Sequence, residues 1–306
     1  MPMTGLWVLL AVTAAFLQNF RNALQKALTR RVSVLGATYA RFVFAAPWAV
    51  LLVVGLISFG GQTMPGPTPA FAIWSVGGAF GQIAGTLLLL HLFSLRNFAV
   101  GNTLAKTETV QAALFGFLLL GDLIAPLALV GILVSLCGVA LLSAVRDAAG
   151  AFSARAVGIG VAAGAAFAFS GVAYRAAALA LDAPPDTPVL RAAATLAFVT
   201  VLQTLLLTIF MNRRVPGEVG RVFSAWRVAV PVGMAGMIAS FSWFAAFAMV
   251  SAAQVKAVGQ IELVFSYLTA RIIFGEHPSF RETLGILLVS AGIILLVLTP
   301  HGNAAP

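Results

Sequence analysis

Two ionisable residues stand at the start of the apolar stretch AKTETVQAALFGFLLLGD, which covers residues 105–122. At bilayer depth such a residue costs about 2.5–3.5 kcal/mol, so it faces a partner or a water-filled cavity. Lys106 can bind an anionic group of a solute, and the carboxylate of Glu108 can exchange a proton. Because the two residues lie about 200° apart around a continuous helix, we predict that they do not pair with each other.

The same pattern recurs towards the C-terminal end of the sequence. Shifted by 154 residues, FSLRNFAVGNTLAKTETVQAALFGFLLLGD (93–122) aligns with FAMVSAAQVKAVGQIELVFSYLTARIIFGE (247–276), and Glu108 aligns with Glu262. Two interpretations of these glutamates remain open. They couple transport to a proton gradient, or they belong to the scaffold and neutralise an arginine or cap a neighbouring helix.

The lysines, unlike the glutamates, do not match between the two copies. Gln260 takes the place of Lys106, and Lys256 lies one turn before Gln260, on much the same helical face as Tyr267. Differences between repeats are where substrate specificity is expected, so Lys106 and Lys256 are predicted substrate contacts. The excess of cations over the two glutamates favours a substrate that carries a carboxylate or a phosphate.

Further polar and aromatic positions complete the predicted site. Gln18, Asn22 and Gln25 recur at helical spacing and share one face, with Lys26 beside it. The alternatives to ligand contact are hydrogen bonds between helices for the polar residues and packing for the aromatic ones. The predicted substrate-binding residues are Gln18, Asn22, Gln25, Lys26, Gln82, Lys106, Trp243, Lys256, Gln260 and Tyr267, and the predicted coupling or structural residues are Glu108 and Glu262.

The amino-acid composition indicates that these residues lie in a membrane protein. Hydrophobic residues make up 61% of the 306-residue chain and charged residues 9%, against about 25% charged residues in soluble domains. The apolar segments are long enough to cross a bilayer as helices, and the first is predicted to be a retained helix rather than a signal peptide. The ten predicted segments are 6–28, 37–59, 70–93, 99–120, 124–145, 156–181, 188–211, 226–250, 253–274 and 282–299.

Several other chemistries are not expected. Cys137 is the single cysteine, and the three histidines are dispersed without metal-ligand spacing, so we predict no metal, no cofactor and no disulfide. The sequence has no HExxH or GxxxxGK[ST] motif, which argues against an enzyme or an ATP-driven pump. The net charge of +9 is interpreted as cationic loops at an anionic leaflet, not as nucleic-acid binding.

The duplication predicts the architecture. Each copy holds five helices, and an odd number inverts the second copy in the membrane, as in many secondary transporters. The expected fold is an all-α membrane protein of ten transmembrane helices in two five-helix inverted-topology repeats, 1–146 and 147–306, around a central cavity. We expect a multi-pass protein of the cell membrane, specifically a bacterial inner membrane, that is monomeric or homodimeric.

The duplicated motif also resembles a known family. The pattern E-x13-[DE], with glycine before the final acid, appears as ETVQAALFGFLLLGD (108–122) and as ELVFSYLTARIIFGE (262–276). It is similar to a signature of EamA-type members of the drug/metabolite transporter superfamily. The resemblance implies a secondary-transporter fold and efflux of small metabolites or amino acids. The family commonly has proline after the glutamate, where this sequence has Thr109 and Leu263.

Loop charge and resemblance disagree on orientation. The loops that follow the odd-numbered predicted helices carry ten arginines, and the loops that follow the even-numbered helices carry none. The positive-inside rule therefore places both termini outside. The resemblance implies termini inside.

The predicted function is secondary transport of a small polar metabolite, an amino acid or another zwitterionic or anionic solute, by alternating access with proton or exchange coupling. The alternatives are an organic cation or an aromatic vitamin-like solute bound by Glu108 and Glu262, a channel, a membrane-embedded enzyme, and a sensor or structural subunit.

Overall fold

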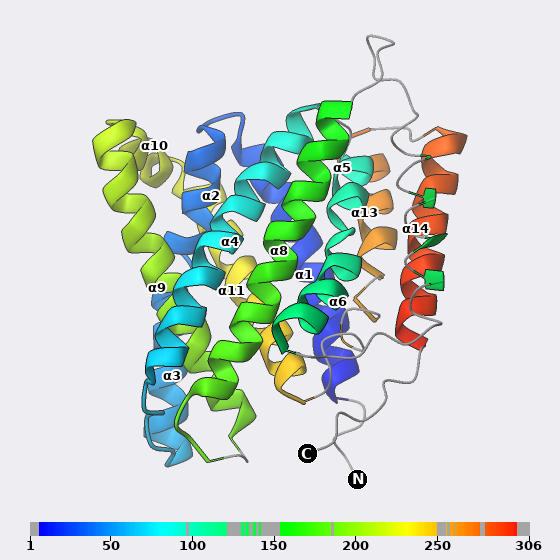
Figure 1. Cartoon of the computed structure of the whole chain (residues 1–306). Helices are drawn as coiled ribbons and strands as arrows, with labels where there is room; N and C mark the ends of the chain where they lie inside the picture. The colour runs from blue at the N-terminus through cyan, green and yellow to red at the C-terminus, as the bar shows by residue number, and fades with distance from the viewer. Residues whose placement is uncertain are drawn as a thin grey trace. The chain divides into compact units, whose positions relative to one another are not determined.

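A computed structural model describes most of the chain (Figure 1). The described residues are 6–95, 98–120, 154–184, 187–249, 261–275 and 279–298, with the separate residues 130, 131, 133, 134, 137, 138, 141, 255, 258 and 259. Within these ranges the chain is all helical apart from turns and short loops, and the β-structure found there is one isolated bridge between Gly66 and Asp182. The predicted all-α class is therefore confirmed for the described part.

The chain divides into two compact units, and each combines segments from both ends of the sequence. Unit 1 comprises Met1–Ile83 and Ala173–Ser251, and unit 2 comprises Ala84–Val172 and Ala252–Pro306. Helices of unit 1 are α1 (Leu6–Leu28), α2 (Val34–Val43), α3 (Ala46–Gly60), α9 (Pro188–Arg214), α10 (Glu218–Ser224) and α11 (Trp226–Met249). Helices of unit 2 are α5 (Phe98–Ala105), α6 (Glu108–Leu120), α13 (Ile261–Ile272) and α14 (Phe280–Leu298), and both α4 (Pro69–Leu95) and α8 (Ala154–Ala180) pass from one unit into the other.

Most helices lie where hydrophobicity predicts them, with two differences. The predicted segments 37–59 and 99–120 are each two helices rather than one. Pro47 occupies the first turn of α3, and because it has no N–H it cannot continue the hydrogen-bond ladder of α2. The second break has no proline and is described with the site. Most of the predicted segment 124–145 lies outside the described residues.

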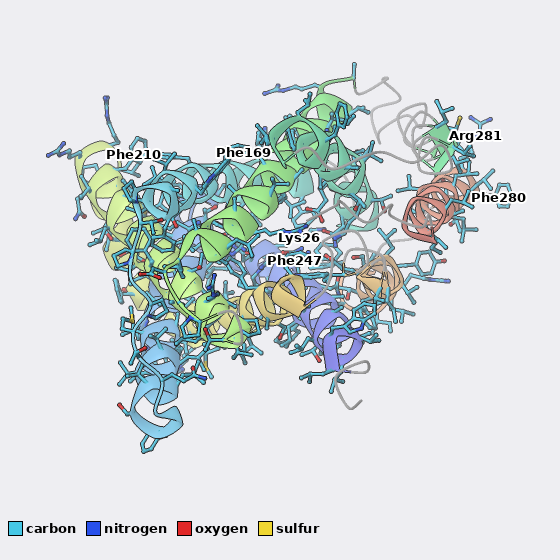
Figure 2. All side chains as sticks on the ribbon, turned by 60° about the horizontal axis from the view of Figure 1, so that its bottom comes forward. Lys26, Phe169, Phe210, Phe247, Phe280 and Arg281 are labelled. Atoms are coloured by element: carbon cyan, nitrogen blue, oxygen red, sulfur yellow. The ribbon has the colours of Figure 1, made fainter. Side chains whose placement is uncertain are left out.

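Five helical segments of the described chain are long and apolar enough to cross a membrane. They are Val34–Gly60, Pro69–Leu95, Ala154–Ala180, Pro188–Arg214 and Trp226–Phe247. Large apolar side chains also face outwards, for example Phe210 on α9 and Phe280 on α14, which are 50% and 82% exposed and stick out from their own helices (Figure 2). Apolar side chains exposed to this extent on apolar helices are suited to contact with lipid, and the protein has the character of a membrane protein.

Small residues bring the helices of unit 1 close together. α11 packs against both α1 and α2. Gly233 on α11 faces the end of α2, where an added Cβ would lie 2.4 Å from Phe44 Cβ and 2.6 Å from the Phe44 carbonyl carbon. A backbone atom at that distance cannot move aside as a side chain can, so the glycine is required by the close approach of the two helices.

We expect Gly233→Ala to destabilise the protein by about 1–3 kcal/mol, the usual cost of overpacking a dense core. The matched control is Gly55→Ala on α3, where an added Cβ meets no atom within 4 Å and alanine favours the helix by about 0.5–1 kcal/mol. Thermal unfolding in detergent tests both variants. Equal melting temperatures for the two variants would contradict this packing.

A buried carboxylate fixes one end of unit 1. Glu218, which begins the short helix α10, accepts a hydrogen bond from the backbone N–H of Ser33 at 2.6 Å and forms an ion pair with Arg221 at 2.5 Å. The Ser33 hydroxyl in turn accepts the backbone N–H of Gly36 and caps α2. Glu218 thus holds α10 against the N-terminus of α2.

Candidate functional site

Lys106 lies in an interruption between two short helices of unit 2. The backbone N–H of Lys106 donates to the carbonyl of Thr103 at 3.0 Å, and the Thr107 hydroxyl donates to the carbonyl of Leu104 at 3.0 Å. Bonds of this i to i+3 type tighten the last turn of α5, and the chain starts again as α6 at Glu108. The interruption is therefore produced by local hydrogen bonds rather than by proline.

The first part of α8 packs directly on this interruption. An added Cβ at Gly164 would lie 2.5 Å from the Thr107 hydroxyl and 2.9 Å from the backbone nitrogen of Glu108. The Gln111 side chain also donates to the carbonyl of Val161 at 3.1 Å. The interruption that carries Lys106 is thus packed against a neighbouring helix.

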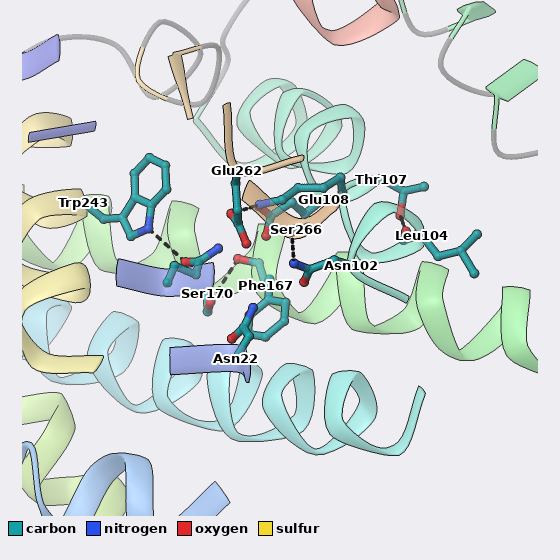
Figure 3. Close-up of polar contacts among 12 residues, drawn as sticks. Asn22, Asn102, Leu104, Thr107, Glu108, Phe167, Ser170, Trp243, Glu262 and Ser266 are labelled. Carbon is teal, nitrogen blue, oxygen red and sulfur yellow. Dashed lines mark hydrogen bonds and ion pairs between the residues drawn. The ribbon is translucent and has the colours of Figure 1, made fainter. Parts of the chain in front are cut away.

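Lys106 lies between two glutamates. Its Nζ is 2.5 Å from Glu262 Oε2 and 3.5 Å from Glu108 Oε1 (Figure 3). The three side chains are between 0% and 7% exposed. The prediction that Lys106 and Glu108 do not pair is wrong, because the helix on which it was based is interrupted between the two residues. We call Lys106, Glu108 and Glu262 the lysine–glutamate cluster.

The lysine–glutamate cluster lies at the N-terminal ends of two helices and beside a hydrogen bond between two uncharged side chains. Glu108 lies in the first turn of α6 and Glu262 in the first turn of α13, where the helix dipole stabilises a carboxylate by about 0.3–1 kcal/mol. Asn102 Nδ2 donates to Ser266 Oγ at 2.5 Å, which links α5 to α13 (Figure 3). Asn102 and Ser266 were not predicted, although each is four residues from a charged member of the cluster and so shares its helical face.

The polar face of α1 makes contacts within unit 1. The indole N–H of Trp243 donates to Gln18 Oε1 at 2.9 Å, and Gln25 Nε2 donates to the carbonyl of Ala37 at 3.0 Å. Asn22 accepts a hydrogen bond from Arg21 at 2.8 Å. Gln18 and Gln25 thus each make a hydrogen bond to a neighbouring helix, as one of the two interpretations of this face expects.

A second polar network in unit 1 joins three helices. Gln203 Nε2 on α9 donates to Gln82 Oε1 at 2.9 Å and to the Tyr174 hydroxyl at 3.1 Å, and that hydroxyl donates to Gln82 Oε1 at 3.1 Å. Gln82 was predicted from sequence, whereas Tyr174 and Gln203 were missed. Tyr174 is the one tyrosine of α8 and Gln203 the one glutamine of α9, so neither belongs to a repeated pattern of amide side chains such as that of α1.

Two buried arginines were also left out of the predicted site. Arg21 on α1 is 3% exposed and Arg41 on α2 is 5% exposed. An added Cβ at Gly236 on α11 would lie 3.2 Å from Arg21 Cδ and 3.5 Å from Arg41 Cγ. Both side chains therefore pass the same point of α11.

The remaining predicted residues lie as follows. Trp243 is buried and stacks on Phe247 with ring centroids 5.8 Å apart. Tyr267 is partly buried, with the Arg271 guanidinium 5.9 Å from its ring centre. Lys26 is partly buried at the end of α1, while Lys256 and Gln260 lie outside the described residues. Within the described ranges no group of three or more histidine, cysteine, aspartate or glutamate side chains is arranged to hold a metal ion.

A model of the EamA-like transporter family matches residues 155–298. The match covers 144 of the 306 residues, from α8 to α14. The EamA-like region includes Glu262, Ser266, Tyr174 and Gln203, whereas Lys106 and Glu108 lie before it. The matched family is one of transporters.

A solved structure entitled "Crystal structure of protein" is similar over 94% of this chain and 95% of its own, with a TM-score of 0.62 and 20% sequence identity. At that identity the similarity shows a shared fold. The shared fold covers nearly the whole chain. No curated protein matches the chain.

Proposed function

We propose that the chain is a secondary active transporter that moves a small anionic or zwitterionic metabolite, such as an amino acid, by alternating access. The observation that carries transport as the class of function is the lysine–glutamate cluster at the interruption between α5 and α6. Interrupted helices with charged groups are tolerated in membranes where they are buried in protein or line a water-filled cavity, and transporters place their binding sites there. The EamA-like region supports the same class of function.

The charges of the cluster support coupling to protons or to exchange. Two carboxylates and one ammonium carry a net charge of −1 when all are ionised. A carboxylate can take up or release one proton, which changes the charge of the cluster by one unit. Proton uptake and release by Glu262 or Glu108 would accompany the conformational cycle.

The position of the two glutamates supports the ten-helix, two-repeat topology with repeats 1–146 and 147–306. Glu108 and Glu262 align in the sequence duplication, and each lies in the first turn of a helix. Equivalent positions in two helices are expected of inverted repeats. We propose on this basis a multi-pass protein of the cell membrane, monomeric or homodimeric.

The arginine-rich loops predict both termini outside. In a Cys137→Ser background, a cysteine at Thr63, in the exposed loop after α3, should react in intact cells with a membrane-impermeant maleimide, and a cysteine at Arg213 should react only after lysis. The reverse labelling would establish termini inside, as the family resemblance implies.

A second candidate substrate is an organic cation or an aromatic vitamin-like solute bound by Glu108 and Glu262. The net charge of −1 on the cluster favours it. A thermal-shift screen of the purified protein against amino acids, organic anions, nucleosides, vitamins and quaternary amines separates the two, since a ligand that binds the folded state raises the melting temperature. Hits confined to amines would replace the anionic substrate, and hits among anions or zwitterions would support it.

A further inference from the structure

We propose that one end of unit 1 is a binding surface for the headgroups of anionic phospholipids. It is formed by the turn between α1 and α2, the end of α9, the short helix α10 and the start of α11, and we call it the arginine surface. The inference goes beyond the proposed transport function, because it concerns the lipid around the protein and not the solute. The arginines of this surface, all of them exposed, are Arg30, Arg31, Arg213, Arg214, Arg221 and Arg227.

Contacts around α10 bring these arginines to the same end of unit 1. The helix packs against α2, α9 and α11 (Figure 1). Glu218, at its start, accepts a hydrogen bond from the backbone N–H of Ser33, which comes two residues after Arg31. α9 ends at Arg214, four residues before Glu218. Arginines from both halves of the sequence therefore lie on one surface.

The arginine surface carries an excess of positive charge. The stretches 6–60 and 188–249 contain one acidic residue, Glu218. Its carboxylate is fully buried and lies 2.5 Å from Arg221, whose side chain is 61% exposed. Six exposed arginines thus stand against one buried glutamate, and an anionic leaflet attracts each exposed cation. A bilayer presents its phosphates as an extended layer, which matches arginines that are spread over four segments.

Exposed aromatic side chains suit this surface to the depth of the lipid headgroups. Trp226 begins α11 and is 54% exposed, and Phe223 in the last turn of α10 is 46% exposed. The Arg227 guanidinium carbon lies 5.7 Å from the centre of the Trp226 ring. Tryptophan is enriched where the hydrocarbon meets the headgroups, and arginine binds phosphate through parallel N–H donors. An indole and a guanidinium side by side therefore fit the glycerol and phosphate region of one lipid.

The sign of the charge selects the class of lipid. Phosphatidylglycerol carries a net negative charge, whereas phosphatidylethanolamine and phosphatidylcholine carry an amine next to the phosphate. A surface with an excess of arginine attracts the first and repels the amines of the other two. The arginine surface should therefore enrich phosphatidylglycerol over phosphatidylethanolamine.

The test is quenching of tryptophan fluorescence in the full-length protein, reconstituted into vesicles of phosphatidylethanolamine and phosphatidylglycerol in fixed proportion. An equal small amount of one lipid or the other carries brominated acyl chains. Bromine quenches only a nearby indole, so the quenching that is lost in Trp226→Phe reports the lipid beside Trp226. We expect brominated phosphatidylglycerol to quench this component at least about twofold more than brominated phosphatidylethanolamine. Both leaflets have the same composition, so the result does not depend on the orientation of the protein.

Trp48 is the internal control. It is 46% exposed, but it lies in the first turn of α3, about 20 Å along the helical segment from Val34 at the start of α2. The component of the quenching that is lost in Trp48→Phe should be the same for the two brominated lipids.

Arg213→Gln/Arg214→Gln/Arg227→Gln removes three charges and leaves Arg221 in place. It should abolish the preference for phosphatidylglycerol at Trp226, while the same three changes to lysine should keep most of it, because attraction to a leaflet depends on charge. Both triple variants should melt near the wild-type temperature, since all three arginines are exposed. If the glutamine variant does not fold, the wild type in rising sodium chloride takes its place, and its preference should fall as the salt screens the charges.

Equal quenching of Trp226 by the two brominated lipids in the wild type would overturn the inference and leave the arginine surface to a soluble acidic partner. A preference that survives the glutamine changes or high salt would also overturn it, because charge would not be its cause. A preference of the same size at Trp48 would do so as well, because the lipid would then not be enriched at the arginine surface.

Discussion

Replacing Lys106 with methionine is expected to lower the free energy of unfolding by about 3–5 kcal/mol, because removing one partner of a buried ion pair leaves charge uncompensated. Lys106 contacts both Glu108 and Glu262, so two buried carboxylates lose the ammonium that they share. Thermal unfolding in detergent, together with the yield of folded protein, measures the loss. Methionine keeps the length of the side chain and so limits the change to its charge.

The double variant Lys106→Met/Glu262→Gln is the matched control. Removing the carboxylate with the shorter contact should restore a large part of the lost stability, and the difference between single and double variants measures the coupling. A Lys106→Met protein that melts at the wild-type temperature would mean that Lys106 contributes nothing to the fold. Lys106 would then serve transport alone, as expected of a substrate contact.

Replacing Glu262 with glutamine is expected to abolish accumulation of solute driven by a pH gradient while one-for-one exchange of labelled solute continues. The amide cannot take up or release the proton, whereas Lys106 and Glu108 remain as a balanced pair of charges. Proteoliposomes with an imposed pH gradient measure accumulation, and the same vesicles without a gradient but with internal solute measure exchange. The solute is the one selected by the thermal-shift screen.

Glu108→Gln is the comparison, because its carboxylate lies farther from Lys106 than that of Glu262. We expect a smaller loss of gradient-driven accumulation in this variant. Retained accumulation with unchanged pH dependence in both variants would remove the glutamates from coupling and leave them the structural role that the sequence also allows.

Hydrophobicity alone located most helices, because long apolar runs in a membrane protein have few alternatives to a helix. It could not locate the break at Lys106, since that break depends on a threonine hydroxyl and on i to i+3 bonds rather than on proline or glycine. Helical geometry then gave the wrong answer for Lys106 and Glu108. The angle between two residues around the helix axis can be derived from their spacing only where the helix is continuous between them.

The site was predicted in part for a similar reason. A polar stripe such as that of α1 can be recognised within one segment, so Gln18 and Asn22 could be named as candidates from the sequence. Arg41, Tyr174 and Gln203 are single residues on separate helices, and only their contacts with other helices identify them. Pairwise contacts between distant segments, such as that of Lys106 with Glu262, were not expected from one sequence.

The most direct test of transport is efflux from proteoliposomes loaded with a defined mixture of amino acids, dicarboxylates, phosphate and quaternary amines, measured by mass spectrometry against protein-free vesicles. We predict that one or a few anionic or zwitterionic solutes leave the vesicles and that their efflux saturates. Retention of every solute, or unselective loss of all of them, would contradict a secondary transporter of small anionic or zwitterionic metabolites.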